Sequence, residues 1–143
     1  MNADTIILKF DGGSRGNPGV AGCGAVLYDT SYREIAYLSV GLEQPSTNNQ
    51  AEYAGFIEGM NLVLDCGHKN VAVYGDSLLV VNHVKGIWKC KSNNLKPLLT
   101  EANEIIKKFD SFSIQHIYRK DNSRADELAN EAMDELTKSL KSC

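Results

Sequence analysis

Residues 5–13 read TIILKFDGG, and this stretch sets the first element of the fold. Thr5–Phe10 is a compact run of β-branched and apolar residues, which is typical of a strand. Asp11-Gly12-Gly13 bounds the run and predicts a turn, with an acidic residue closing the strand. Six of the twelve glycines fall between Gly12 and Gly24, so the segment GGSRGNPGVAGCG is expected to contain tight turns before a second strand at Ala25–Tyr28.

Beyond these strands the apolar residues switch between the periods of strands and helices. The predicted elements are a strand at Arg33–Gly41, a helix from Asn49 to the stop at Cys66-Gly67, a buried strand at Val71–Tyr74, helices at Ser77–Val84 and Leu95–Phe109, a strand at Phe112–Tyr118 and a helix at Arg124–Leu140. This order, βββαβααβα, predicts an α/β fold in which helices flank a mixed sheet. Residues 1–143 show no repeat and no linker, which predicts a single domain.

Composition narrows the possible functions. The chain has 143 residues, of which 43% are apolar, enough for one core. The formal net charge of -3 provides no overall positive field, so any nucleic-acid site must be local. No apolar run approaches the roughly 20 residues of a membrane span, and residues 1–5 lack a secretory signal, so we expect a cytoplasmic protein without a membrane partner. The spacing of Cys23, Cys66, Cys90 and Cys143 indicates reduced thiols.

Four acidic residues stand at the ends of predicted elements. Asp11 closes the first strand and Asp76 follows the Val71–Tyr74 strand, while Glu52 and Asp126 lie in the first turns of two helices. Strand ends and the helix starts that follow them share one edge of an α/β sheet, so these side chains can converge. Four carboxylates in one place repel one another unless cations neutralise them. The pattern therefore predicts a site for a hard metal ion.

Each acid also has a purely structural interpretation. Asn49-Gln50-Ala51-Glu52 and Ser123-Arg124-Ala125-Asp126 both resemble capping boxes. Asp76 with Ser77 is compatible with a simple helix start, and Asp11 with two glycines is compatible with a simple turn. Only the occurrence of all four acids together, with the motifs around them, favours a catalytic or metal-binding role.

That joint pattern includes four motifs: DGGSRGNPG at 11–19, TNNQAE at 47–52, GDS at 75–77 and NSRADELA at 122–129. In order and spacing they resemble those of ribonuclease H type 1, in a minimal form that lacks a basic insertion. The resemblance implies a five-stranded mixed sheet flanked by helices, and endonucleolytic cleavage of RNA paired to DNA. It also implies that Asp11, Glu52, Asp76 and Asp126 are both the catalytic residues and the ligands of two Mg²⁺ ions, with Mn²⁺ as a substitute.

The resemblance further assigns the substrate contacts. Asn17, Asn48 and Asn49 stand where the family contacts the minor groove, Thr47 resembles a DNA-phosphate contact, and Ser77 adjoins the site. Neutral amides suit the 2′-hydroxyl of RNA because they both donate and accept hydrogen bonds. The alternative roles are a turn asparagine and a helix cap. An RNA/DNA hybrid duplex is the expected partner, no nucleotide cofactor is expected because no phosphate-binding glycine motif is present, and a monomer is favoured.

The chain departs from the family in two places. The basic insertion is reduced to residues 83–95, with Trp88 as a tentative DNA-strand contact or packing residue. In the loop before the last helix, where many members of the family have a histidine, this chain has none. Arg119 or Lys120 is therefore a candidate to contact the phosphate in its place. The three histidines, His68, His83 and His116, are interpreted as structural or solvent-facing. Two alternatives stay open: a relaxed nuclease that also cuts double-stranded RNA, and a non-catalytic hybrid-binding module.

Overall fold

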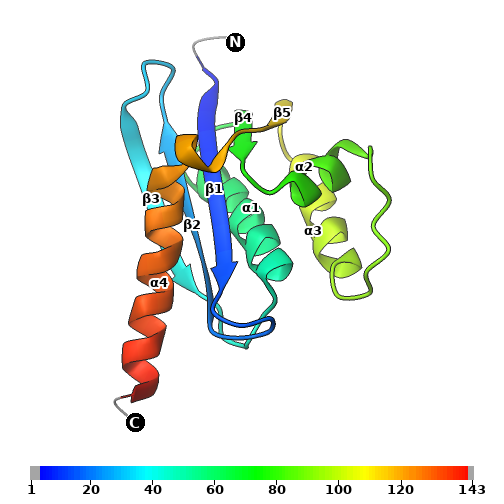
Figure 1. The fold of residues 1–143 in the computed structure, drawn as a ribbon. Coiled ribbons are helices and arrows are strands. Elements are labelled where there is room, and N and C mark those ends of the chain that lie inside the picture. Colours follow the sequence, from blue (N-terminus) through cyan, green and yellow to red (C-terminus); the bar gives the residue numbers. More distant parts are fainter. Residues whose placement is uncertain (1–3, 142–143) are drawn as a thin grey trace.

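The computed structural model describes residues 4–141 and contains a five-stranded mixed sheet with strand order β3-β2-β1-β4-β5 (Figure 1). The strands are β1 (Ile6–Ser14), β2 (Ala21–Tyr28), β3 (Glu34–Gly41), β4 (Asn70–Gly75) and β5 (Ser111–His116). The first three form an antiparallel meander, whereas β4 pairs parallel with both β1 and β5. The predicted element order and the predicted mixed sheet are confirmed.

The helices lie close to their predicted positions. They are α1 (Asn48–Asp65), α2 (Leu78–Lys85), α3 (Lys96–Ile106) and α4 (Ser123–Lys141). The strand predicted to reach Tyr118 ends at His116, and a short 3-10 turn, η1 (Arg119–Asp121), leads into α4. Arg119 and Lys120 belong to this turn.

The prediction that β1 ends in a turn at Asp11 was wrong. β1 continues through Asp11-Gly12-Gly13, which pair with Gly24, Cys23 and Gly22 of β2. Helices pack directly on these glycines: a Cβ at Gly12 would lie 2.1 Å from the Ala51 carbonyl oxygen of α1, and one at Gly24 would lie 2.5 Å from Leu128 Cβ of α4. At these positions within the strands, glycine is therefore needed because the helices pack close against the sheet.

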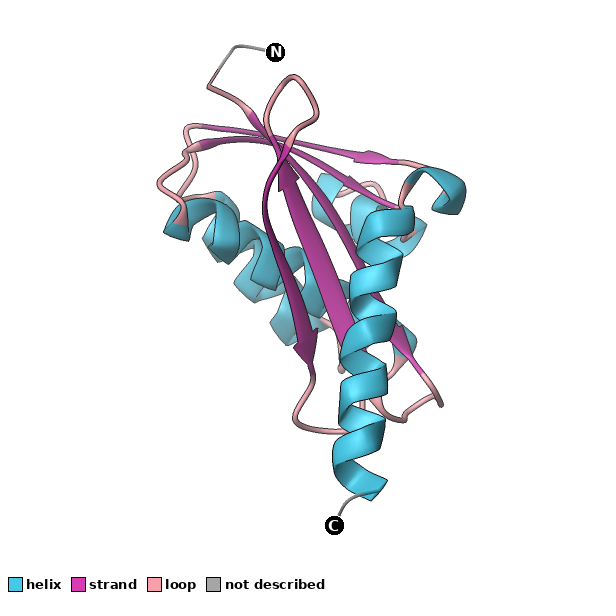
Figure 2. Cartoon of the chain, turned by 90° about the vertical axis from the view of Figure 1, so that its left-hand side faces the viewer, coloured by secondary structure: helices cyan, strands magenta, loops and turns pink. Residues whose placement is uncertain are grey.

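α1 and α4 cover opposite faces of the sheet. A Cβ at Gly12 would meet α1, whereas one at the next residue, Gly13, would meet the Met133 side chain of α4. Because successive strand residues point to opposite faces, the two helices must lie on different sides. Figure 2 shows α4, the helix that leads to the C-terminus, on one side of the strands. Leu8, Phe10, Phe56 and Met60 are fully buried where β1 meets α1.

Two expectations from composition have structural counterparts. Cys23, Cys66 and Cys90 are free thiols, while Cys143 lies outside the described residues. Within residues 4–141, none of the helices combines the length and the apolar character that a membrane span requires.

We predict that Gly12→Ala lowers the free energy of unfolding by about 1–3 kcal/mol, because the added methyl group meets the backbone of α1. Gly13→Ala is the matched control: its Cβ would lie 3.2 Å from Met133 Cε, the end of a flexible side chain, so we expect a change within about 0.5 kcal/mol. Urea unfolding of both variants measures the difference. Equal losses would contradict the assignment of Gly12 to close packing.

Candidate active site

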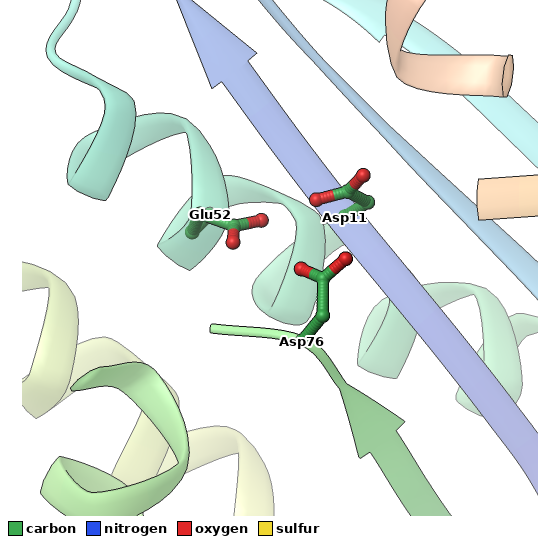
Figure 3. Close-up of side chains that lie close together, drawn as sticks. All are labelled: Asp11, Glu52 and Asp76. Atoms are coloured by element: carbon green, nitrogen blue, oxygen red, sulfur yellow. The ribbon is translucent and has the colours of Figure 1, made fainter. Parts of the chain in front are cut away.

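Three carboxylates from separate elements meet at the edge of the sheet. Asp11 lies on β1, Glu52 on α1 and Asp76 immediately after β4, and one oxygen atom of each lies within 4.8 Å of the others. Figure 3 shows the three side chains pointing toward one another. Within the described part of the chain, this group has the geometry to hold a metal ion.

Strand register explains why Asp11 and Asp76 are neighbours. In the parallel pair of β1 and β4, Phe10 lies opposite Gly75, which is the last residue of β4. The next residue along each strand is an aspartate, Asp11 or Asp76. Both aspartates therefore lie at the point where the pairing of β1 with β4 ends. The aspartates converge although β1 itself continues, because its pairing with β4 ends at this point.

Glu52 has no capping role, contrary to the structural alternative considered from sequence. The capping box of α1 consists of Thr47 and Gln50: Thr47 Oγ1 accepts from the Gln50 backbone N–H, and Gln50 Oε1 accepts from the Thr47 backbone N–H. The helix therefore begins one residue earlier than predicted, and Glu52 lies beyond its first turn. The carboxylate is free to face β1.

The Gly12 backbone N–H holds the first two acids in place. It donates to Asp11 Oδ1 at 2.8 Å and to Glu52 Oε1 at 2.5 Å. This shared donor requires the same close approach of α1 to β1 that excludes a Cβ at Gly12. One backbone group thus positions two carboxylates that repel each other.

The electrostatics of the pair reflect burial without a cation. Both side chains are buried, with residue exposures of 6%. The pKa of Asp11 is raised to about 7, chiefly by burial and also by the charge of Asp76, against the hydrogen bonds with Glu52 and Gly12, which lower it. Burial, followed by the interaction with Asp11, raises the pKa of Glu52 as well. Near neutral pH the pair therefore retains protons that a divalent cation would displace.

Asp126 stands apart from this trio but lines the same cleft. It lies in the first turn of α4, and its side chain raises the pKa of Asp11. Arg119 Nη2 of η1 lies 3.8 Å from Asp126 Oδ1. Arg119 therefore lies beside the acids, while Lys120 is exposed and lies outside the cleft lining. A contact of either residue with the phosphate stays a prediction.

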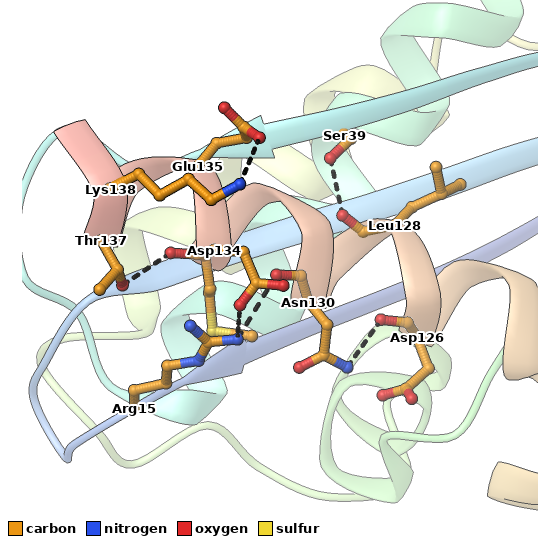
Figure 4. A network of polar contacts seen from close by, with 10 residues as sticks. Arg15, Ser39, Asp126, Leu128, Asn130, Asp134, Glu135, Thr137 and Lys138 are labelled. Atoms are coloured by element: carbon orange, nitrogen blue, oxygen red, sulfur yellow. Dashed lines mark hydrogen bonds and ion pairs between the residues drawn. The ribbon is translucent and has the colours of Figure 1, made fainter.

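The acidic cleft has a volume of about 480 Å³, and its lining includes residues that sequence reasoning missed. His116, interpreted as structural or solvent-facing, is exposed but lines this cleft with Tyr118. The feature that could have identified His116 is its position at the end of β5, where it pairs with Gly75, the last residue of β4. Arg15 also lines the cleft, where Nη2 contacts Asp134 Oδ1 at 2.6 Å (Figure 4).

A second cleft adjoins the first, since Asn48 lines both. It brings together four residues predicted to contact substrate: Asn17, Thr47, Asn48 and Asn49. The Asn17 Oδ1 atom accepts from the Asn48 backbone N–H at 3.0 Å, which ties the loop after β1 to the start of α1. Lys89 and Lys91 also line this cleft and give it positive charge.

Two predicted contacts are not part of either cleft lining. Ser77 is buried and caps α2, because its Oγ accepts from the Val80 backbone N–H at 3.2 Å. Trp88 follows α2 with 44% exposure, so it is not a core residue. Apart from these two and Lys120, the predicted site residues line one cleft or the other: Thr47 and the amides line the second, and the acids with Arg119 line the first.

Comparisons with known proteins agree with this geometry. Residues 9–132 match the family model described as reverse transcriptase-like. A ribonuclease H of Hydrogenovibrio crunogenus is 36% identical, in a match covering 92% of this chain and 97% of that protein. The chain belongs to the ribonuclease H type 1 family. The crystal structure of RNase H1 from Halobacterium salinarum superposes with a TM-score of 0.89 at 38% identity, covering 92% of this chain and 98% of that one.

Other ribonuclease H relatives differ in length or were solved with nucleic acid. LC11-RNase H1 in complex with RNA/DNA hybrid superposes with a TM-score of 0.87 at 35% identity, over 92% of this chain and 99% of that one. The present chain spans 37% of the length of three mycobacterial relatives and 63% of that of a Halobacterium salinarum ribonuclease HI. As a ribonuclease H type 1 chain it is of the minimal form, since residues 86–95 alone connect α2 to α3.

We predict that the stability of the metal-free protein falls as pH rises from about 4 toward about 7. The folded pKa of Asp11 is raised from 3.8 to about 7, so the folded state holds a proton that the unfolded chain releases. Its stabilising effect is present below pH 4 and is lost as pH rises through 7. Asp11→Asn should shrink this fall and stabilise the protein at pH 8 by on the order of 1–3 kcal/mol.

Urea unfolding in EDTA across pH 4–8 measures this dependence. Asp65→Asn, an exposed carboxylate at the end of α1, serves as the matched control and should follow the wild type. An Asp11→Asn profile parallel to that of the wild type would contradict the assignment. Addition of Mg²⁺ at pH 8 should stabilise the wild type more than Asp11→Asn.

Proposed function

We propose that this chain acts as a single ribonuclease H domain, a metal-dependent endonuclease that hydrolyses the RNA strand of RNA/DNA hybrids. The observation that carries the proposal is the convergence of Asp11, Glu52 and Asp76 within 4.8 Å, beside Asp126 in one open cleft. A relative with the same fold was solved with an RNA/DNA hybrid, which supports this substrate.

The donor set fits divalent metal ions. Its atoms are hard carboxylate oxygens, the ligands that Mg²⁺ prefers, and the pKa values of the two buried acids are raised mainly by that burial. Asp11, Glu52, Asp76 and Asp126 would hold two Mg²⁺ ions in this cleft. Mn²⁺ would substitute. Bound there, such ions would supply activation of a water molecule and stabilisation of the leaving 3′ oxygen, the chemistry that yields 5′-phosphate products.

The side chains of the acidic cleft have separate tasks in this scheme. Glu52 and Asp11 are fixed by the Gly12 N–H, so their oxygens are oriented before substrate arrives. Asp126 has a side-chain exposure of 33% and stands at the open side of the cleft. Arg119, with 82% exposure, reaches this side and would pair with a phosphate of the cleaved strand.

The second cleft would hold the duplex beside the cut. Its amides, Asn17, Asn48 and Asn49, offer donors and acceptors to the sugar edges of a minor groove. Lys89 and Lys91 supply the local positive charge that the net charge of -3 lacks, and would contact the phosphates of a strand. Because Asn48 belongs to both clefts, a duplex held in one is aligned with the acids of the other.

Cleavage of a labelled hybrid in Mg²⁺ tests the function directly. We expect the wild type to cut the RNA strand, and Asp76→Asn to lower kcat by at least about a thousandfold, because a carboxylate is removed from the metal site. Asp65→Asn is the control and should retain wild-type activity. Retained cleavage by purified Asp76→Asn would overturn the assignment.

The same assay separates the alternatives. Cleavage of double-stranded RNA at a comparable rate would identify a relaxed nuclease. Tight hybrid binding without cleavage in Mg²⁺ or Mn²⁺ would identify a binding module and overturn the proposal.

We predict that Arg119→Ala lowers kcat about tenfold, a larger loss than Lys120→Ala causes, because Arg119 alone of the two lines the acidic cleft. Turnover on the hybrid at saturating substrate measures both. Equal losses of kcat in the two variants would contradict the different placement of Arg119 and Lys120 relative to the acidic cleft.

A further inference from the structure

Arg119 lies beside the acids because of where its turn lies, not because its side chain is packed. The side chain is 82% exposed, and within residues 4–141 the polar contact found for its guanidinium is the one to Asp126. None of the three residues of η1 is buried, so the turn has no apolar anchor in the core. A segment with few buried contacts opens readily unless polar contacts hold it. The contacts that hold η1 therefore decide where Arg119 lies.

Two consecutive residues of β1 hold the end of η1. Lys9 Nζ donates to the Asp121 carbonyl oxygen at 3.0 Å. The Phe10 carbonyl oxygen accepts from Asn122 Nδ2 at 2.8 Å, and Asn122 is 1% exposed, so this second contact is buried. The strand that carries the first acid of the site thus also fixes the turn.

Backbone hydrogen bonds connect the anchored end of the turn to Arg119. The Asp121 N–H donates to the Tyr118 carbonyl oxygen at 2.9 Å, and the Asn122 N–H donates to the Arg119 carbonyl oxygen at 3.0 Å. The Asn122 carbonyl oxygen in turn accepts from the Asp126 N–H at 3.1 Å. Residues 118–122 are therefore one hydrogen-bonded unit, which joins β1 to the start of α4.

The ammonium group of Lys9 is held in place by two aromatic rings. Its Nζ lies 5.9 Å from the ring centroids of Tyr28 and of Tyr32, within the range of cation–π contacts. Lys9 lies opposite Val26, and Tyr28, two residues further along β2, shares that face of the sheet. Tyr32 has a φ of 61°, a left-handed conformation that is rare for a bulky residue. The turn between β2 and β3 thus accepts backbone strain at a residue that contacts Lys9.

We propose that Lys9 is a positioning residue, whose ammonium group clamps η1 to β1 and thereby holds the Arg119 guanidinium at the acidic cleft. In this arrangement Asn122 is the buried, fixed end of the turn, and Lys9 is the contact that keeps the rest of the turn from moving away. The inference rests on the proposed function, because the position of Arg119 affects turnover only if it meets a phosphate of the cleaved strand. Sequence analysis did not single out Lys9.

A double-mutant cycle on kcat tests the clamp. In the wild-type background we expect Lys9→Met to lower kcat about threefold on saturating hybrid, as part of the loss predicted for Arg119→Ala. In the Arg119→Ala background the same substitution should change kcat by less than about 1.5-fold, because no guanidinium is left to position. Lys69→Met is the matched control: Lys69 Nζ donates to the Lys108 carbonyl oxygen at 3.2 Å, outside both cleft linings, and its loss should leave kcat unchanged.

Amide hydrogen exchange measured by NMR gives a readout that does not require cleavage. Lys9→Met should speed exchange of the Asp121 and Asn122 N–H groups about tenfold, because the turn opens more often. The urea midpoint of Lys9→Met should equal that of the wild type, since only the turn is released. Lys69→Met should change neither quantity.

The Arg119 Nε–H resonance reports the position of the guanidinium itself. In the wild type, Asp126→Asn should shift this resonance, because Arg119 Nη2 lies 3.8 Å from Asp126 Oδ1. In the Lys9→Met background the same substitution should shift it much less, because the guanidinium is no longer held beside residue 126.

The outcomes separate the inference from the proposed function. Equal losses of kcat from Lys9→Met in both backgrounds, or an unchanged kcat in the wild-type background, overturn the positioning role while cleavage by the wild type stands. Unchanged amide exchange in η1 overturns the clamp, and a lowered urea midpoint identifies Lys9 as a stabilising residue of the whole fold instead. Absence of cleavage by the wild type overturns the catalytic proposal, and faster exchange with a reduced Arg119 response in Lys9→Met then still supports the clamp.

Discussion

The mutual burial of Asp11 and Glu52 is the constraint on which the rest of the site depends. Two carboxylates share one backbone donor, the Gly12 N–H, in a place where water is largely excluded. Burial raises the pKa of each, so the arrangement costs free energy in the metal-free protein. A divalent cation bound by the two carboxylates would replace the retained protons and relieve this cost.

The fold around the acids makes this arrangement possible. α1 approaches β1 so closely that Gly12 has no room for a Cβ, and this contact brings Glu52 to the strand. The parallel register of β1 and β4 delivers Asp76 beside Asp11, and α4 on the opposite face delivers Asp126. The acids therefore come from both faces and from one edge of a single sheet. A shift of the β1–β4 register by one residue would separate Asp76 from Asp11.

Sequence reasoning predicted the fold better than the bounds of its elements. The order of strands and helices was correct because apolar periodicity reports which face of each element is buried. The glycine segment after Phe10 was misread as a turn, because glycine signals both turns and close backbone approach, and local pattern alone does not distinguish them. Glu52 was assigned to a possible capping box for a similar reason: Thr47 and Gln50 formed the box instead, one register earlier.

By itself, the sequence determined the class of fold, because apolar periodicity gives the order of strands and helices. Through its motifs it offered the four acids and the amides as candidate site residues. The tertiary structure alone decided which groups lie together: three acids with oxygen atoms within 4.8 Å of one another, Asp126 in the same cleft beside Arg119, and His83 against a buried tyrosine. Such contacts join residues distant along the chain. They depend on helix–sheet distance and strand register, which no local pattern encodes.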